Sequence, residues 1–250
     1  DNQGQWYSAK PSITPPNRLV PPVHIRLLSS ETSLSLRNLT GFNNTGNVDI
    51  WPSEELLAAC CLQPEILAKL AGNRVMELGA GMTGLAGLFL AGSGVPRAVW
   101  LTDGNELSAD NLAVILQRNQ ALGTLRCSTK SAVLRWDRRP TDLHRLQSDC
   151  DLVLGADVLF FTEHHLALIS TIRWLLKPVT GRALICAPRR GRSFEQFLTS
   201  IQQDGGLKLE PEFCGRQFVN YNPFPEIQGQ FASVAADKDP PLMLCLSRRE

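Results

Sequence analysis

Residues 74–84 read Arg-Val-Met-Glu-Leu-Gly-Ala-Gly-Met-Thr-Gly and carry the strongest structural signal in the chain. An apolar run ends there in a glycine turn, and residues 85–91 then place good helix formers at helical spacing. The pattern predicts a strand, a tight turn and a helix. Glycines let backbone N–H groups approach a ligand, and the helix N-terminus offers unpaired donors with partial positive charge. The stretch therefore indicates a site for a nucleotide-like ligand.

A carboxylate decides between the two nucleotide classes that fit this turn. Residues 79–84 match the dinucleotide pattern Gly-x-Gly-x-x-Gly, which leaves a Rossmann oxidoreductase as an alternative. Glu77, however, lies two residues before the first glycine, where a carboxylate repels a pyrophosphate and attracts a cation. S-adenosyl-L-methionine carries a sulfonium and an ammonium and has no phosphate. Glu77, together with the lack of a Tyr-x-x-x-Lys pair, therefore favours S-adenosyl-L-methionine.

A second carboxylate follows the next predicted strand. Asp103 ends the apolar run 98–102, so we expect it at the tip of the neighbouring strand, where it accepts both hydroxyls of a ribose. Hydrogen bonds to a charged group contribute about 1.5–3 kcal/mol each. The alternative for Glu77 or Asp103 alone is a solvated loop carboxylate. Two carboxylates at successive strand ends favour a ligand site.

Composition limits the class of protein. A chain of 250 residues with 43% hydrophobic content can bury one large core in one or two domains. No apolar run reaches the roughly 18 residues of a membrane span, and no basic-then-apolar signal opens the chain. We expect no membrane partner and a cytoplasmic location, with the nucleus as an additional compartment. The net charge of +1 gives no indication of nucleic-acid binding.

The cysteine pattern predicts reduced thiols and no metal site. The chain has seven cysteines, without a Cys-x-x-Cys pair or a histidine at ligand spacing. Most of them fall inside apolar runs, so we expect them to be buried. They stand at positions 60, 61, 127, 150, 186, 214 and 245.

The N-terminal fifty residues differ in pattern from the rest of the chain. Five prolines within residues 1–22 predict an extended arm or a disordered tail. Segments 23–28 and 33–40 alternate between apolar and polar residues, which predicts a small β-hairpin. A turn-rich loop over 41–48 follows. We therefore divide the chain into an arm and hairpin over 1–50 and a main domain over 51–250.

A helix is expected to open the main domain. Ser53 precedes an apolar-periodic stretch and is a candidate N-cap, although Pro52 obscures the boundary. Trp51 lies just before this helix. Its two interpretations are a core residue and a wall of the ligand pocket.

Strands and helices then alternate, which predicts an α/β fold with a mostly parallel sheet, helices on both faces and an antiparallel last strand. Ligands bind such sheets at the carboxyl ends of the strands, where segments 77–84, 103–106, 135–137 and 155–160 fall. The expected strands are 74–79, 97–102, 127–134, 151–155, 182–187, 207–213 and 241–246, and the expected helices begin at 83, 106, 163 and 193. A loop rich in proline and asparagine, over 220–230, separates the last two strands.

The four segments expected at the carboxyl ends of the strands resemble those of the seven-strand (class I) protein-lysine methyltransferases. Over about residues 39–204 the chain resembles more particularly the members that modify calmodulin, through the segments 41–48, 51–55, 101–106, 134–137 and 187–191. The resemblance implies a Rossmann-like seven-strand fold, S-adenosyl-L-methionine as cofactor, and calmodulin, an acidic protein, as substrate of a monomeric enzyme.

The resemblance also assigns residues to the cofactor. It places the methionine end at Glu77, Gly79 and Gly81, the ribose at Asp103, and the adenosine near Asn105. Trp136 and Asp137 would lie beside the adenine, although Trp136 alone also fits a core aromatic residue. The remaining cofactor-binding candidates are Trp51 and Ala156.

Residues 157–160, Asp-Val-Leu-Phe, match the family's Asp-x-x-(Tyr/Phe) pattern, which takes the place of a catalytic base. Lysine must attack through a neutral nitrogen, yet a lysine pKa near 10.4 leaves only about one molecule in a thousand neutral. The resemblance implies a narrow apolar channel which, with the neighbouring sulfonium, lowers that pKa, while Asp157 and nearby carbonyls aim the nitrogen; Asp157 and Phe160 are the catalytic candidates. The alternative for Asp157 is a cap of the next helix.

A basic segment over 188–192 follows another central strand, with Arg189 and Arg190 as candidate contacts to an acidic substrate. The alternative is a solvated loop. Two other functions remain open: a related lysine methyltransferase acting on a chaperone or an elongation factor, and a non-catalytic module that binds S-adenosyl-L-methionine. The intact motif at 157–160 argues against the module.

Overall fold

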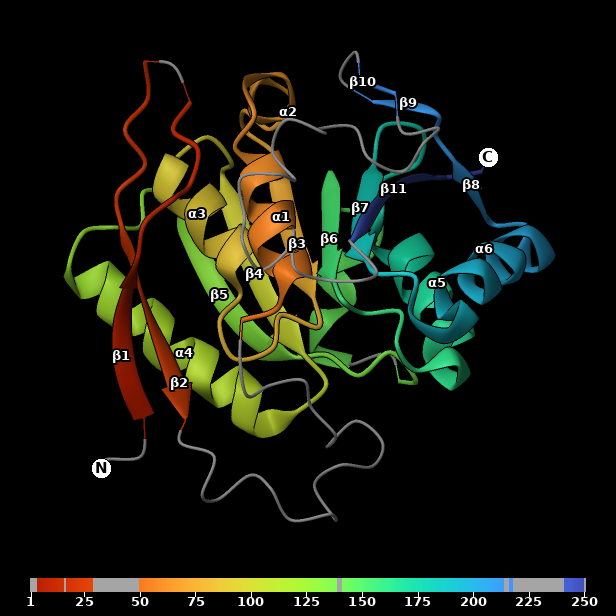
Figure 1. Cartoon of the computed structure of the whole chain (residues 1–250), viewed down its shortest axis with the longest axis horizontal. Coiled ribbons are helices and arrows are strands. Elements are labelled where there is room, and N and C mark those ends of the chain that lie inside the picture. The colour runs from red at the N-terminus through yellow and green to blue at the C-terminus, as the bar shows by residue number, and fades with distance from the viewer. Residues whose placement is uncertain are drawn as a thin grey trace.

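The computed structural model describes residues 4–15, 17–28, 50–138, 141–213, 216–217 and 241–249. Their centre is a seven-stranded sheet in the order β5-β4-β3-β6-β7-β11-β8 (Figure 1). The five strands from β5 to β7 are parallel, while β11 runs antiparallel to β7 and β8. This arrangement confirms the predicted sheet. The strands are β3 (Arg74–Leu78), β4 (Ala98–Asp103), β5 (Ser128–Val133), β6 (Leu152–Ala156), β7 (Arg182–Ala187), β8 (Leu207–Leu209) and β11 (Leu242–Arg248).

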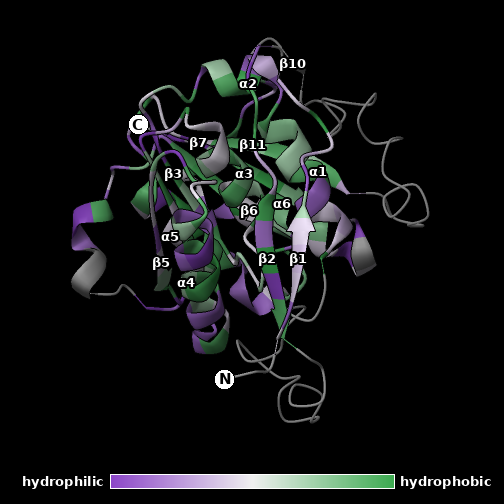
Figure 2. Cartoon of the chain, turned by 90° about the vertical axis from the view of Figure 1, so that its left-hand side faces the viewer, coloured by the Kyte–Doolittle hydropathy of each residue, from purple (hydrophilic) through white to green (hydrophobic). Residues whose placement is uncertain are grey.

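Helices cover both faces of the sheet because the side chains of its strands alternate between two hydrophobic clusters. Val75 and Leu154 belong to the cluster with α1, α3 and α4, while Met76 and Val153 belong to the cluster with α5 and α6. Helix α4 alternates between hydrophobic and hydrophilic residues along its length (Figure 2). The helices are α1 (Pro52–Cys61), α2 (Pro64–Ala68), α3 (Leu85–Ser93), α4 (Glu106–Ala121), α5 (His165–Leu175) and α6 (Ser193–Asp204), with 3-10 turns η4 (Thr141–Leu146), η5 (Thr162–His164) and η6 (Arg190–Arg192).

Helix α1 begins two residues earlier than a cap at Ser53 would require. The N-cap is Trp51, and Pro52 occupies the first helical position. Proline suits that position because its missing N–H would have no partner there and its φ is already helical. Ser53 is instead buried inside the first turn. The prediction of Ser53 as the cap was therefore wrong.

The N-terminal hairpin is present, and it contains a strand that the sequence did not predict. Strand β2 (Val23–Leu28) pairs antiparallel with β1 (Gly4–Ala9), in register from Gly4 opposite Leu28 to Ala9 opposite Val23. Residues 4–9 are thus a strand, and neither an extended arm nor a disordered tail. The expected strand over 33–40 lies outside the described residues.

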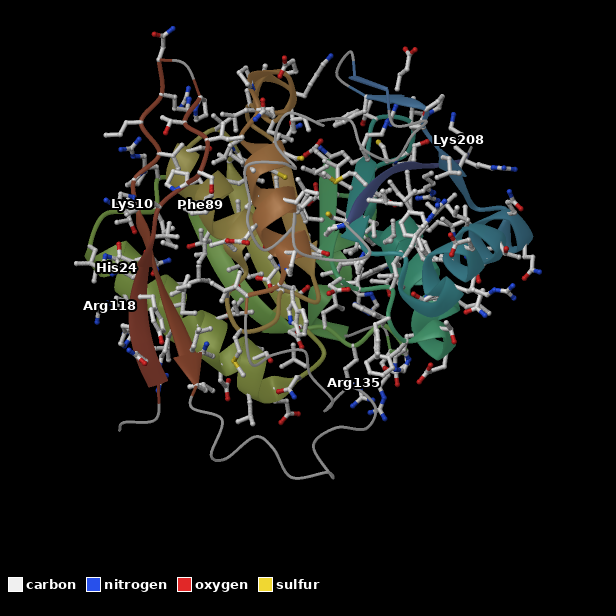
Figure 3. All side chains as sticks on the ribbon, viewed as in Figure 1. Lys10, His24, Phe89, Arg118, Arg135 and Lys208 are labelled. Carbon is white, nitrogen blue, oxygen red and sulfur yellow. The ribbon has the colours of Figure 1, made fainter. Side chains whose placement is uncertain are left out.

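The hairpin is attached to α4 by polar contacts. Asn119 accepts a hydrogen bond from the backbone N–H of His24 at 2.8 Å and donates one to its carbonyl oxygen at 2.6 Å. The guanidinium of Arg118 lies 4.4 Å from the ring centroid of Trp6. Figure 3 labels His24 and Arg118 where the hairpin crosses α4. The amide of Asn111 donates both to Arg26 O, at 2.8 Å, and to the Met82 carbonyl of the glycine turn, at 2.9 Å.

The strand expected over 207–213 is two short strands in different sheets. β8 belongs to the central sheet, whereas β9 (Glu212–Phe213) pairs with β10 (Arg216–Gln217). Pro211, which has no backbone N–H to donate, lies between β8 and β9. The loop expected over 220–230 lies outside the described residues. No helix in the described segments has the length and apolarity needed to cross a bilayer.

Helix α3 packs against the sheet at the closest approach that its sequence allows. A Cβ atom on Gly87 would lie 2.8 Å from Oε2 of Glu77 and 3.1 Å from Cγ1 of Val99, and it would also overlap the side chain of Leu101. Glycine at this position therefore sets the distance between helix and sheet.

We expect Gly87→Ala to lower the free energy of unfolding by about 1–3 kcal/mol, because overpacking outweighs the better helix propensity of alanine. Gly92→Ala is the matched control on the same helix, since its Cβ would meet no atom closer than 3.3 Å. Urea denaturation of both variants measures the difference. Equal effects at the two positions would contradict close packing at Gly87.

Candidate active site

The sheet reverses its strand order between β3 and β6. From β3 the chain adds β4 and β5 on one side, and β6 and β7 then extend the other side. Glu77 on β3 pairs with Leu154 on β6 at this reversal. Open parallel sheets bind ligands beyond the carboxyl ends of the strands at such a point. The topology thus brings segments 77–84, 103–106, 135–137 and 155–160 to one edge of the sheet, as predicted.

The glycine turn after β3 exposes its backbone to this edge. Gly79, Gly81 and Gly84 all have positive φ, between 58° and 60°. A Cβ atom on Gly79 would lie 2.9 Å from Cγ1 of Val158 and 3.3 Å from Cζ2 of Trp136. Trp136 is half-buried, and its ring flanks the turn. Only glycine fits here, so the backbone remains open to a ligand.

Glu77 is buried under α3, with 1% of its surface exposed. Its Oε2 accepts a hydrogen bond of 2.8 Å from the backbone N–H of Gly87, the third residue of that helix. Burial raises the pKa of Glu77 from 4.5 to about 7. The solvated-loop alternative for Glu77 is therefore wrong. Because Glu77 occupies a donor at the helix N-terminus, that N–H is not available to a phosphate.

Asp103 is also buried, so the solvated-loop alternative fails for it as well. Its Oδ2 accepts from the backbone N–H of Gly81 at 2.9 Å, and its Oδ1 accepts from that of Asn105 at 2.8 Å. Burial raises its pKa despite these bonds. The side chain of Asn105 caps α4 by accepting from the Ser108 N–H at 3.2 Å. A carboxylate has about four acceptor positions, so Asp103 keeps capacity for a ligand.

Sequence reasoning missed Glu54, a third buried carboxylate in this region. It is 8% exposed and accepts a hydrogen bond from the hydroxyl of Thr83 in the glycine turn. The backbone N–H of Trp51 donates to its Oε1 at 3.5 Å. Burial, together with the nearby charges of Glu77 and Asp157, raises the pKa of Glu54 to about 8. The available signal was a glutamate at the third position of a helix that starts with proline.

Asp157 lies directly beyond the carboxyl end of β6, whose last residue, Ala156, is buried. Its φ is +54°, and its backbone N–H donates to Cys186 O on β7 at 2.8 Å. The next helical turn begins at Thr162 with Phe161 as its N-cap, so Asp157 does not occupy the cap position. Phe160 is 55% exposed and packs edge-on against Phe161, with 4.9 Å between ring centroids.

Two of the charged candidates form ion pairs within the protein. Asp137 pairs with Arg135 at 3.3 Å, which lowers the Asp137 pKa, and Arg135 lies at the periphery of the molecule (Figure 3). Arg189 pairs with Glu195 at 2.9 Å. The side chain of Arg190 lies outside the described residues. The structure thus groups the carboxylates at the glycine turn and leaves Asp137 and Arg189 exposed.

The residues present fit a ligand that carries positive charge and a sugar. No lysine or arginine among the described residues forms an ion pair with Glu54 or Glu77, so neither group has a cationic partner there when it is ionised. The Gly79 turn exposes backbone beside them. In the same described segments, no group of three or more His, Cys, Asp or Glu side chains is arranged to hold a metal ion.

Comparison with solved structures supports the fold. The branched-chain polyamine synthase of Thermus thermophilus superposes with a TM-score of 0.52 at 15% identity, covering 79% of this chain and 56% of that protein. At this identity the likeness concerns the fold alone.

Comparison with curated sequences identifies the family. Calmodulin-lysine N-methyltransferase of Arabidopsis thaliana is 36% identical over 180 residues, which cover 71% of this chain and 57% of that protein. Protein N-lysine methyltransferase METTL21A of Danio rerio is 36% identical over 134 residues, with coverages of 54% and 58%. EEF1A lysine methyltransferase 3 of Xenopus tropicalis is 26% identical over 196 residues, with coverages of 78% and 79%. The chain therefore spans less than two thirds of the length of the first two relatives.

A family model described as lysine methyltransferase matches residues 29–204, which is more than half of the chain. S-adenosyl-L-methionine is the methyl donor of this family, which confirms the cofactor predicted from Glu77 and the glycine turn. The chain therefore belongs to the lysine methyltransferase family.

Proposed function

We propose that this lysine methyltransferase transfers methyl groups from S-adenosyl-L-methionine to a lysine side chain of calmodulin. The main structural support for this reaction is the position of Asp157 beside the point where the strand order reverses. The hydrogen bond from its backbone N–H to Cys186 O holds it there. The choice of calmodulin is supported by the relative from Arabidopsis thaliana, which is 36% identical. It is also supported by basic side chains at the rim, Arg189, Arg135 and Arg138, which suit an acidic protein.

The cofactor has three points of attachment in this proposal. Glu77 and the open backbone at Gly79 and Gly81 hold the methionine end, while Asp103 accepts the ribose hydroxyls. The flat ring of Trp136 and the Trp51 side chain border the site from opposite segments of the chain. When bound, S-adenosyl-L-methionine supplies a methyl group attached to a positively charged sulfur. Asn105, Ala156 and Asp137 complete the proposed set.

The protein's part in the reaction is to bind a neutral lysine in the correct orientation. Apolar surface from Phe160 and Val158 disfavours the ammonium form, so it lowers the pKa of an entering lysine. Asp157 then accepts a hydrogen bond from the amine and fixes its direction. Orientation of this kind can contribute about 7–11 kcal/mol to a group transfer.

A substrate other than calmodulin is the alternative. The relatives METTL21A and EEF1A lysine methyltransferase 3 carry names that place them in the same class of reaction, and the second names an elongation factor. Another protein, such as a chaperone or an elongation factor, is the competing type of substrate in this proposal.

We expect labelled methyl to pass from S-adenosyl-L-methionine to a lysine of purified, unmethylated calmodulin, as measured by mass spectrometry. A cell lysate lacking calmodulin is the parallel substrate. A discrete labelled protein in the lysate, with none on calmodulin, would replace calmodulin as the substrate. If neither calmodulin nor any lysate protein were labelled, although the enzyme still bound the cofactor, the result would contradict the proposed reaction.

We expect Glu77→Gln to stabilise the empty protein and to weaken cofactor binding. Because the folded pKa of about 7 exceeds the ordinary 4.5, folding takes up a proton, and stability falls as pH rises through that window. At pH 8 the variant should gain about 1–3 kcal/mol in the free energy of unfolding. Its dissociation constant for S-adenosyl-L-methionine should rise at least about tenfold. Denaturation at pH 4.5 and 8, with calorimetric titration, tests both.

We expect Asp157→Asn to lower kcat about 100-fold while the cofactor dissociation constant stays within about threefold, because the change removes an orienting group from the amine. Asparagine tolerates a positive φ, so the backbone should be retained. Glu163→Gln, an equal charge change on the exposed turn η5, is the matched control. Steady-state kinetics that left kcat unchanged would show Asp157 to be structural.

A further inference from the structure

Glu54 connects three segments of the site, although no family motif assigns it a role. It belongs to the first turn of α1, and it accepts a hydrogen bond from Thr83 in the turn that follows β3. The Trp51 N–H donates to its other oxygen at 3.5 Å. Its carboxylate also lies close enough to Glu77, on β3, and to Asp157, beyond β6, for their charges to interact.

The surroundings of Glu54 contain negative and neutral groups. Among the described residues, the titratable groups whose charges act on Glu54 are the carboxylates of Glu77 and Asp157. Two buried thiols interact in turn with these carboxylates: Cys61 of α1 with Glu77, and Cys186 of β7 with Asp157. In the described part of the chain, no lysine, arginine or histidine forms an ion pair with Glu54. A buried carboxylate without an opposite charge is costly, so this environment favours a cation from outside the protein.

We propose that Glu54 is a further positioning residue of the cofactor site: it ties the start of α1 to the glycine turn and adds negative charge, beside Glu77, where the cationic methionine end binds. This inference rests on the proposed placement of the methionine end at Glu77. The hydroxyl of Thr83 fixes the direction of the Glu54 carboxylate. The sulfonium of the donor carries a positive charge that the product, S-adenosylhomocysteine, lacks. Glu54 thereby favours the donor over the product.

The charge of Glu54 depends on whether a cation is present. In the empty protein, burial raises its pKa to about 8, so the carboxyl keeps its proton at neutral pH. A bound cation favours the ionised form and lowers that pKa, so binding at pH 7 releases a proton to solvent. Affinity for the donor therefore rises with pH up to about 8 and levels off above it.

The test compares Glu54→Gln with Glu55→Gln, which removes the same charge from the same helical turn. Calorimetric titration at pH 7 and 8.5 gives the affinities for S-adenosyl-L-methionine and S-adenosylhomocysteine, and two buffers of different ionisation enthalpy give the protons released. We expect Glu54→Gln at pH 8.5 to weaken donor binding about tenfold and product binding less than about threefold. At pH 7 it should release fewer protons than the parent. Glu55→Gln should match the parent.

The inference would be overturned if Glu54→Gln lost affinity equally for S-adenosyl-L-methionine and S-adenosylhomocysteine. It would also be overturned if the variant released as many protons as the parent; Glu54 would then be a structural residue. If Glu54→Gln does not fold, Thr83→Val replaces it. Thr83→Val removes the hydroxyl that donates a hydrogen bond to Glu54. The affinity of this variant for S-adenosyl-L-methionine should therefore be reduced at pH 7 and recover by pH 9. A pH-independent loss would contradict the proposal.

The two proposals fail separately. Methyl transfer to protein lysine by the parent tests the proposed function without reference to Glu54. A parent that binds the donor with proton release, yet labels no protein, would overturn the function alone. If the parent labels protein but Glu54→Gln prefers S-adenosyl-L-methionine over S-adenosylhomocysteine as strongly as the parent does, only the role of Glu54 is overturned.

Discussion

The hydrogen bond between the buried Glu77 carboxylate and the Gly87 N–H is the constraint on which the site depends. It requires a strand residue to reach the first turn of α3, so position 87 must lack a side chain. The same contact orders the turn between β3 and α3, where the glycines adopt positive φ. A carboxylate held there without a cation leaves the empty protein with unbalanced charge. Binding and folding therefore make opposing demands on Glu77, as is common at functional sites.

The sequence predicted the sheet well because its central strands are short, mostly apolar and bounded by turn residues. Residues 75–78 and 99–102 are buried, and most of them are apolar, which makes these strands easy to recognise. The hairpin shows the limit of this reasoning. Residues 4–9 are all exposed or half-buried, and the prolines that follow them indicate irregular structure. Their strand exists through pairing with β2, a contact that local periodicity does not encode.

The site was predictable where residues follow the strand ends and unpredictable where helix packing supplies them. Glu77 and Asp103 could be placed because each belongs to a central strand next to its turn. Glu54 lies more than twenty residues upstream, and nothing in its own segment shows that α1 covers the glycine turn. Thr83 had no assigned role for the same reason. Pairs of this kind become visible only when the tertiary structure joins two segments.

The position of β11 affects the order in which the sheet can assemble. Although it spans residues 242–248, it lies between β7 and β8, and it pairs with both. Among the described strands β8 has no other partner in the central sheet, so it cannot join until β11 has been synthesised. The parallel half, from β5 to β7, contains its own strand partners and can form earlier on the ribosome. Completion of the second edge is thus a late, long-range event, of the type that slows folding.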